Sequence, residues 1–222
     1  MSKKYNFLNN NFKNLINKFD SFKKKKKSFI LNKYPELFQF IKKKYRNDIN
    51  LVLSVVKNNG FLLQFADIKL RDNYEIVKLA VNNFGFAIQF ASERLRDNKE
   101  IAIEAVKSSG YNLKYLSKRL KKDESIVLKS LQKNAYSLKY ADKSFKKNKP
   151  FLFKIFKFYL GGASFKYIHN DLKKDKKIVL SALKTYGYAY KDLPKNNKLK
   201  YDKDIIFSAV KQISFVLKNL DK

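Results

Sequence analysis

Few residues of this chain have the types and spacing that catalysis needs. His169 is the single histidine and there is no cysteine, which excludes a zinc site built from histidine and cysteine and a cysteine–histidine nucleophile pair. The chain also lacks the glycine-rich loop ending in Lys and Ser or Thr that cradles phosphates. About half of the 19 acidic residues stand at predicted helix starts, which leaves few for an acid–base pair. We therefore expect no enzyme, no cofactor and no metal site, and interpret His169 as a surface residue.

The residues that do recur at a fixed spacing are basic. One position holds Arg or Lys every 25 residues, or every 27 in the last two intervals, and in three copies a second Lys follows directly. These residues are Arg46, Arg71, Arg96, Lys121, Lys122, Lys146, Lys147, Lys173, Lys174 and Lys200. Copies that stack side by side would align them as a basic stripe along one edge. Because phosphate contacts need only charge, they are candidate polyanion-binding residues.

The basic stripe has a structural alternative. Arg71 and Arg96 have Asp72 and Asp97 beside them, so each cation of this position could instead pair with an acid or a carbonyl group of a neighbouring loop. A second basic set lies two residues earlier, where we expect a helix to end and where cations offset the helix dipole. It comprises Lys44, Lys69, Arg94, Arg119 and Lys198.

The net charge of +31 also has two interpretations. A field this one-sided attracts polyanions. The excess of Lys, Asn, Ile, Phe and Tyr is, however, typical of AT-rich codons, which would make part of the charge a coding bias. Arg is scarce, 5 residues against 45 Lys, and this argues against base-specific readout of nucleic acid.

A 25-residue repeat positions these side chains. Its first helix is expected to begin at Leu51, Ile76, Ile101, Ile126, Phe151, Ile178 and Ile205. Three residues before each start stands Asp or Asn, which are typical N-cap residues: Asp48, Asn73, Asn98, Asp123, Asn148, Asp175 and Asp202. Positions of a copy are counted from this helix start, which is position zero. Apolar residues at positions zero, one, four and five, as in Ile76, Val77, Ala80 and Val81, form one face of a helix.

A second helix is expected after each first one. Glycine at position nine, as in Gly60, Gly85 and Gly110, suits the left-handed residue that ends a helix, and the apolar pattern from Leu62 to Leu70 predicts a second helix of about three turns. Neither helix is stable alone, so neighbouring copies must share a core. The sequence therefore predicts an all-α tandem array of about seven 25-residue helical hairpins, an α-solenoid or superhelical bundle.

The chain ahead of the array is predicted to form an N-terminal segment, 1–27, and a degenerate half repeat, 28–45, before seven copies over 46–222. Leu8, Phe12, Leu15, Phe19 and Phe22 recur at helical spacing, which predicts an amphipathic helix that caps the first copy; a membrane-surface or partner helix is the alternative. The run 23–27 of five lysines is interpreted as a solvated linker, with a nuclear-localisation or nucleic-acid contact as the alternative.

The repeat resembles a known family. The stretch Leu95-Arg96-Asp97-Asn98-Lys99-Glu100-Ile101, with Ala105-Val106 and Gly110, is similar to a helical repeat known only as a domain of unknown function, whose signature is close to L-R-D-D-x-E-[IV]-V-x-x-A-V-x-x-N-G-x-A-L-x-[FY]-A. The resemblance covers roughly 45–222 and is strongest in the second and third copies. It implies an all-helical repeat, of the kind found in protists, amoeba-associated bacteria and large DNA viruses, and it implies no activity. This chain departs from the signature where Lys-Lys replaces Arg-Asp.

One aromatic residue per copy recurs in the predicted second helix: Phe40, Phe65, Phe90, Tyr115, Tyr140 and Tyr167. We interpret these rings as core or inter-repeat packing; a base-stacking platform is the alternative.

The chain as a whole is expected to be a non-catalytic scaffold that binds a protein partner, for example an acidic protein. The alternative is sequence-independent nucleic-acid binding along the basic edge, for instance as an internal structural protein of a virus or parasite. No transmembrane segment or signal peptide is recognised, so the expected location is the cytoplasm, the nucleus or a virion.

Overall fold

The computed structural model describes residues 10–220, with side chains through residue 213. This range is helical and contains no strand, which confirms the all-α class. Leu8, a residue of the predicted N-terminal helix, lies outside the described residues. The chain divides into two compact units, Met1–Ala105 and Val106–Lys222, and each is treated separately below.

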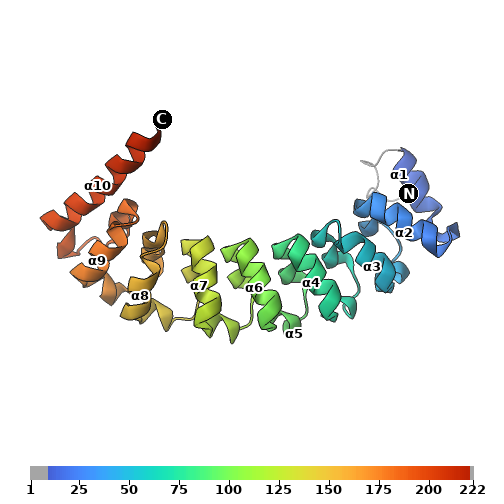
Figure 1. The fold of residues 1–222 in the computed structure, drawn as a ribbon, viewed down its shortest axis with the longest axis horizontal. Helices are drawn as coiled ribbons and strands as arrows, with labels where there is room; N and C mark the ends of the chain where they lie inside the picture. Colours follow the sequence, from blue (N-terminus) through green and yellow to red (C-terminus); the bar gives the residue numbers. More distant parts are fainter. Residues whose placement is uncertain (1–9, 221–222) are drawn as a thin grey trace. The chain divides into compact units, whose positions relative to one another are not determined.

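The α-helices of the described range follow one another as short segments (Figure 1). They are α1 (Asn10–Asn17), α2 (Lys24–Lys33), α3 (Ile49–Val56), α4 (Tyr74–Asn83), α5 (Glu93–Arg96), α6 (Lys99–Ser108), α7 (Glu124–Lys133), α8 (Lys149–Ile155), α9 (Lys176–Leu183) and α10 (Lys203–Leu220). Helices α3, α4, α6, α7, α8, α9 and α10 correspond to the seven predicted first helices.

The second element of each copy is a 3-10 helix, not the three-turn α-helix that the sequence predicted. Residue Ala66 has an extended conformation, with φ −66° and ψ 154°, and divides the predicted helix in two. A first segment of five to seven residues is followed by a short turn that leads into the next α-helix. The first segments are η3 (Pro35–Gln39), η5 (Gly60–Phe65), η7 (Gly85–Phe90), η8 (Gly110–Tyr115), η10 (Ala135–Lys139), η12 (Gly161–Tyr167) and η14 (Gly187–Asp192).

The turns that follow are also mostly 3-10 helical, a form that proteins use in short pieces and as connectors. They are η4 (Lys43–Asn47), η6 (Leu70–Asp72), η9 (Leu120–Lys122), η11 (Phe145–Lys147), η13 (Asn170–Lys174) and η15 (Lys198–Tyr201), with α5 in the corresponding place of its copy. The remaining 3-10 helix, η2 (Phe19–Ser21), belongs to the N-terminal segment.

In the first unit, the copies lie side by side in chain order. Helix α2 contacts α3 and α3 contacts α4, while η3, η5 and η7 contact one another in the same order. The core lies between these two layers, where Leu63, Val77, Ala80 and Ile88 are fully buried. An α layer and a 3-10 layer thus share one interior.

The second unit repeats this arrangement. Helices α7, α8, α9 and α10 contact their neighbours in order, as do η8, η10, η12 and η14. Leu113, Val127, Leu138 and Phe165 are fully buried between the layers. Stacking in chain order within both units confirms the tandem helical array.

The predicted N-caps are confirmed at all seven helix starts. In each copy the Asp or Asn side chain accepts a hydrogen bond from one or two backbone N–H groups of the first turn. Asn73 accepts from the N–H of Ile76 at 3.1 Å, and Asp123 accepts from Ser125 and Ile126. These bonds satisfy donors that a helix start leaves without partners.

The role predicted for the repeated glycine is wrong. No described glycine has a positive φ, and Gly60 begins a 3-10 helix instead of ending an α-helix. A Cβ at Gly60 would overlap the carbonyl oxygen of Ala80 in the next copy, and one at Gly110 would overlap that of Ser130. Glycine is required here because the 3-10 helix packs directly on the backbone of the following α-helix.

The register of the array also differs from the prediction at both ends. The five-lysine run, predicted as a linker, forms the N-cap and first turn of α2, so the predicted half repeat over 28–45 is a whole copy with η3 and η4. At the other end, α10 continues as one helix of 18 residues where a hairpin was predicted. Seven helix pairs remain, from α2–η3 to α9–η14, shifted by one copy toward the N-terminus.

Candidate functional site

The first basic residue of the predicted stripe in each copy is called here the inward basic residue. In four copies it points back into its own copy. Its cation donates to the carbonyl oxygen seven residues earlier, at the end of the 3-10 helix, where unpaired carbonyl groups concentrate negative partial charge. The pairs are Arg46 with Gln39 (3.0 Å), Lys121 with Lys114 (2.7 Å), Lys146 with Lys139 (2.9 Å) and Lys173 with Lys166 (3.2 Å). The structural alternative proposed from the sequence placed the carbonyl partner in a neighbouring loop; the partner instead belongs to the same copy, and it serves Lys as well as Arg.

Burial further limits what these cations can reach. Lys173 is buried and also donates to the carbonyl oxygen of Asp192 at 3.2 Å. Burial lowers the pKa of both Lys146 and Lys173. Arg46, Arg71 and Arg96 are half-buried, and their Nε atoms have no hydrogen-bond partner among the residues that the structure describes. Lys200, the last of the series, is half-buried as well.

The lysines that follow this position are placed differently. Lys122, Lys147 and Lys174, called here the edge lysines, are exposed and stand immediately before the N-caps of α7, α8 and α9. All three belong to the second unit. Of the ten candidate polyanion-binding residues, these three alone are exposed; the other seven are half-buried or buried.

A backbone hydrogen bond joins adjacent copies at this level in four places. The carbonyl oxygen of the inward basic residue accepts from the N–H group 21 to 23 residues later, as in Asp67 to Arg46 (2.9 Å), Ser92 to Arg71 (2.9 Å), Asp142 to Lys121 (3.0 Å) and His169 to Lys146 (2.9 Å). The side chains of the same donors cap the following turn. Sequence analysis missed this second cap series, although its Asp, Ser or His recurs with the period of the repeat.

His169 thereby has a structural role at the surface. Its Nδ1 accepts weakly from the N–H group of Asp171 at 3.4 Å and lies 3.1 Å from that residue's carboxylate. Among the described residues there is no group of three or more His, Asp or Glu side chains that could hold a metal ion. No described helix has the length and apolar character needed to cross a membrane.

Many acidic side chains are engaged with cations of an adjacent copy. Lys149 lies 2.7 Å from Asp175, and Lys176 lies 2.8 Å from Asp202. The hydrogen bonds from these lysines are the main reason that the pKa values of Asp175 and Asp202 fall below the ordinary value of 3.8. The same two carboxylates are helix N-caps, so each of them connects two copies of the second unit.

The outer side of the 3-10 helices carries the aromatic series. Position 14 of the copy, predicted as packing, is half-buried in Phe65, Phe90, Tyr115, Tyr140 and Tyr167 and buried in Phe40. Rings at position 10 meet the position-14 ring of the next copy edge to face: Phe61 with Phe90 at 5.6 Å, Tyr111 with Tyr140 at 5.1 Å and Tyr136 with Tyr167 at 6.3 Å between centroids. This supports inter-repeat packing, because edge-to-face rings do not offer parallel faces to stacked bases.

The chemistry of this side changes between the two units. In the first unit, positions 10 and 14 hold Phe and position 13 holds Gln, as in Phe61, Gln64 and Phe65. In the second unit, Tyr replaces Phe and exposed Lys replaces Gln, as in Tyr111, Lys114 and Tyr115. We call the second set the tyrosine–lysine face; it comprises Tyr111, Lys114, Tyr115, Tyr136, Lys139, Tyr140, Lys166, Tyr167, Tyr188 and Lys191.

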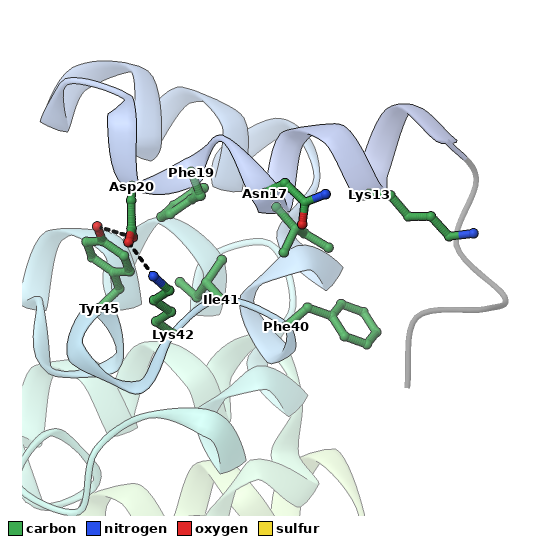
Figure 2. A pocket seen from close by; sticks show the side chains of 9 residues that line it. Lys13, Asn17, Phe19, Asp20, Phe40, Ile41, Lys42 and Tyr45 are labelled. Atoms are coloured by element: carbon green, nitrogen blue, oxygen red, sulfur yellow. Dashed lines mark hydrogen bonds and ion pairs between the residues drawn. The ribbon is translucent and has the colours of Figure 1, made fainter. Parts of the chain in front are cut away.

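A pocket of about 360 Å³ lies between the N-terminal segment and the first copy. Figure 2 shows Asp20 reaching Tyr45 and Lys42 across it. The carboxylate of Asp20 accepts hydrogen bonds from the Tyr45 hydroxyl and the Lys42 ammonium, both at 2.6 Å, which lowers the pKa of Asp20 strongly. Phe19 of η2 is buried, with its ring 5.2 Å from that of Tyr45, so the N-terminal segment packs on the first copy.

Comparison with known proteins identifies the repeat and nothing beyond it. The sequence profile of a family described as "Domain of unknown function (DUF4116)" matches six overlapping stretches of the chain. They are 28–71, 49–96, 73–121, 98–146, 123–160 and 148–198. No curated protein and no solved structure matches the chain.

Proposed function

Because the chain belongs to the family described as a domain of unknown function (DUF4116), whose matches span 28–198, we propose that it is a non-catalytic scaffold that binds a protein partner. The observation that carries this proposal is the outer side of the 3-10 layer. Phe61, Tyr136 and Tyr188 occupy the same position of three copies and are 43%, 45% and 41% exposed. Large aromatic side chains that remain at a surface are enriched in protein interfaces.

The pattern of conservation inside the copy supports the same proposal. Positions zero, one, four and five of the first helix are buried from α3 to α9, so the core of these copies is closed by internal stacking. The side chains at positions 10 and 13 change from copy to copy without affecting that core. The chemistry of this surface is therefore set independently of the fold.

The absence of cysteine from the sequence allows a direct test. A single cysteine, introduced as Lys139→Cys on the outer side of η10 or as Lys129→Cys on α7, would carry a thiol-linked photocrosslinker; both lysines are exposed and belong to the same copy. In a nuclease-treated lysate of the native cell, we expect protein adducts from position 139 and few from position 129. The equivalent variants Lys114→Cys and Lys191→Cys extend the test to other copies. Equal adducts from positions 139 and 129, or no adducts from any of these copies, would contradict the scaffold proposal.

A second candidate function is sequence-independent binding of nucleic acid, and the edge lysines favour it. They are exposed at the same place in three successive copies, on a chain of net charge +31. Replacing Lys122, Lys147 and Lys174 by Gln should weaken binding of fluorescent DNA or RNA. It should also reduce the slope of log affinity against log salt by about 2 to 3.

The control for this test removes the same charge elsewhere. Lys129, Lys157 and Lys184 are exposed and lie away from the edge, on or just after the α-helices of the same three copies. Their replacement by Gln should leave nucleic-acid affinity nearly unchanged. If both triple variants lose affinity equally, the binding reflects total charge and the edge has no special role.

A further inference from the structure

The tyrosine–lysine face has one missing ring. Position 10 holds Tyr111, Tyr136 and Tyr188 in the third, fourth and sixth copies of the array that begins at Leu51, but Ala163 in the fifth. Ala163 is equivalent to the others because Gly162 before it packs on the Ala182 carbonyl as Gly60 packs on that of Ala80. The N–H of Gly162 also donates to Thr185 at 3.0 Å, as that of Gly60 donates to Asn83.

A cleft of about 240 Å³ opens at this place. Its lining includes Tyr136, Leu160, Ala163 and Tyr186, all from the second unit. The hydroxyl groups of Tyr136 and Tyr186 lie 3.3 Å apart across the fifth copy, and this contact raises the pKa of Tyr186 to about 12. The volume is below that of ordinary small-molecule sites, about 300–1,000 Å³, and suits a single side chain.

The backbone beside the cleft departs from the regular repeat. Leu160 has φ 53°, the left-handed conformation, and is the only non-glycine residue with positive φ in the described chain. It belongs to the two-residue insertion of this copy, and its side chain is 42% exposed. Tyr159 beside it is 89% exposed. Backbone strain of this kind is concentrated at functional sites, and here it holds two large side chains at the rim.

Two exposed lysines follow residues of the cleft by one turn of 3-10 helix. In a 3-10 helix, residues three apart lie one above the other, so Lys139 is in line with Tyr136 and Lys166 with Ala163. The equivalent pair is seen in contact in the third copy, where Lys114 lies 5.7 Å from the centre of the Tyr111 ring. Lys139 and Lys166 are exposed, and their carbonyl groups, not their ammonium groups, are engaged by the inward basic residues.

The chain itself shows what a Tyr–Lys pair binds. Tyr74 and Lys78 together hold the carboxylate of Glu100, at 2.5 and 2.7 Å. Tyr45 and Lys42 hold that of Asp20 in the same way (Figure 2). Both pairs lie in the first unit and have carboxylate partners there. The tyrosine–lysine face offers the same donors in exposed positions.

From these observations we propose that the cleft at Ala163 receives one aromatic side chain of a partner protein, from an extended acidic segment whose carboxylates contact Lys139 and Lys166. The ligand ring takes the place that Tyr111 and Tyr136 occupy in their own copies, and the insertion at Leu160 forms the rim that holds it. Nucleic acid fits this place less well, because the neighbouring rings are fixed edge to face and offer no common stack.

The test uses the full chain and a synthetic glutamate-rich peptide with one central tryptophan. The protein has no Trp, so all tryptophan emission comes from the peptide. We expect the emission to shift to shorter wavelength on binding, and a peptide with Ser in place of Trp to bind at least about tenfold more weakly, as for a buried aromatic anchor. Equal binding of the two peptides would overturn the proposal.

Two variants locate the site. Ala163→Tyr places in the cleft the residue that neighbouring copies hold and should reduce peptide affinity at least about tenfold. Lys139→Gln with Lys166→Gln should also weaken binding, whereas the matched edge pair Lys147→Gln with Lys174→Gln should not. If Ala163→Tyr fails to fold, as judged by circular dichroism, the lysine pairs decide alone. Equal loss from both pairs would overturn the proposal, as would unchanged binding by a folded Ala163→Tyr variant.

A competition experiment with an oligonucleotide tests whether nucleic acid, instead of a peptide, occupies the cleft. A short single-stranded oligothymidylate that displaces the peptide, and that is itself weakened by Ala163→Tyr, would assign the cleft to nucleic acid and overturn the proposal. This inference rests on the proposed scaffold function, and the two can fail separately. Protein adducts obtained at other copies but not at position 139 would refute the cleft alone, whereas absence of adducts at every copy would refute the scaffold.

Discussion

At the scale of the residue, the glycine that begins most of the long 3-10 helices is fixed by a neighbour. Its missing Cβ leaves room for the carbonyl group of position four in the next copy, where Ala80, Ser130 and Ala182 are themselves small. Close approach of two backbones, with no left-handed conformation, explains this residue. One requirement therefore couples two residues 20 positions apart.

Gly60→Ala should consequently destabilise the first unit. The added methyl group meets backbone, which cannot move aside as a flexible side chain can, and overpacking of this kind costs about 1–3 kcal/mol. Urea unfolding followed by circular dichroism measures the change. Lys57→Ala, an exposed position three residues earlier, serves as the control and should stay within about 0.5 kcal/mol of the parent; a Gly60→Ala variant as stable as that control would refute the packing argument.

Single residues also mark what the sequence could and could not predict. The seven N-caps were predictable because Asp and Asn bond to the backbone three residues away, a local effect that one copy contains in full. The hydrogen-bond partner of Lys121 or Lys146 was not predictable, because a lysine before a helix start can turn outward to solvent or inward to a carbonyl group. Only the preceding 3-10 helix, whose carbonyl group it meets, decides between these.

At the scale of the element, the choice between α- and 3-10 helix was beyond the sequence pattern. Apolar residues from Leu62 to Leu70 fit one face of an α-helix, but Asp67 caps a new turn with its side chain and gives its N–H group to Arg46 of the preceding copy. That bond needs an extended residue at Ala66. A contact between copies thus overrides a local periodicity, and periodicity alone contains no sign of it.

The Asp residues that cap the α-helices also make the stability of the fold depend on pH. The pKa of Asp175 is lowered in the folded protein, mainly by Lys149, so the folded state binds fewer protons than the unfolded state once the pH falls toward 3.8. The stabilisation from Asp175 is present above its unfolded pKa and is lost as the pH falls through the lower folded value. Asp202 behaves alike, through Lys176.

Asp175→Asn should therefore reduce the loss of stability that occurs as the pH falls into the acid range. Asn caps the equivalent helix starts at Asn73 and Asn148, so the cap is kept and only the charge is lost. At neutral pH the change should be within about 1 kcal/mol, as for an exposed ion pair. Urea midpoints measured from neutral pH down through the acid range check this, with exposed Asp171→Asn as the control. Acid limbs of equal steepness in Asp175→Asn and the parent would contradict the prediction.

At the scale of the whole molecule, the period was predictable and the ends were not. Interior copies share a signature, so their register followed directly from the sequence. The first copy escaped it because its opening turn is lysine, with Lys23 at the N-cap and no side-chain cap bond. The last departs because no 3-10 segment follows α10 within the described residues. In the described range these two copies each pack on one other copy, and the constraint that produces the signature is weaker there.

An array stabilised by nearest neighbours should also open in parts. Gly60→Ala should increase amide hydrogen exchange in α3, η5 and α4, and leave α8 and α9 of the other unit unchanged, because interface energies in a repeat array act between adjacent copies. Exchange measured by mass spectrometry on peptic fragments gives the comparison. Equal loss of protection over 149–183 would show instead that both units unfold as one.

The backbone hydrogen bond between adjacent copies bears on how such a chain can lengthen. The copy that contains Asp67 and Arg71 donates one such bond and accepts one, so duplication of a complete 25-residue segment creates a new donor and a new acceptor together and leaves none without a partner. Duplication of half a copy would strand one of each in the interior. Genes for this repeat should accordingly grow and shrink in whole periods. Where a short insertion falls at the bond itself, as in the loop 194–197, Pro194 has no N–H group and a side chain takes over: Asn197 donates to the carbonyl oxygen of Lys173 at 2.7 Å.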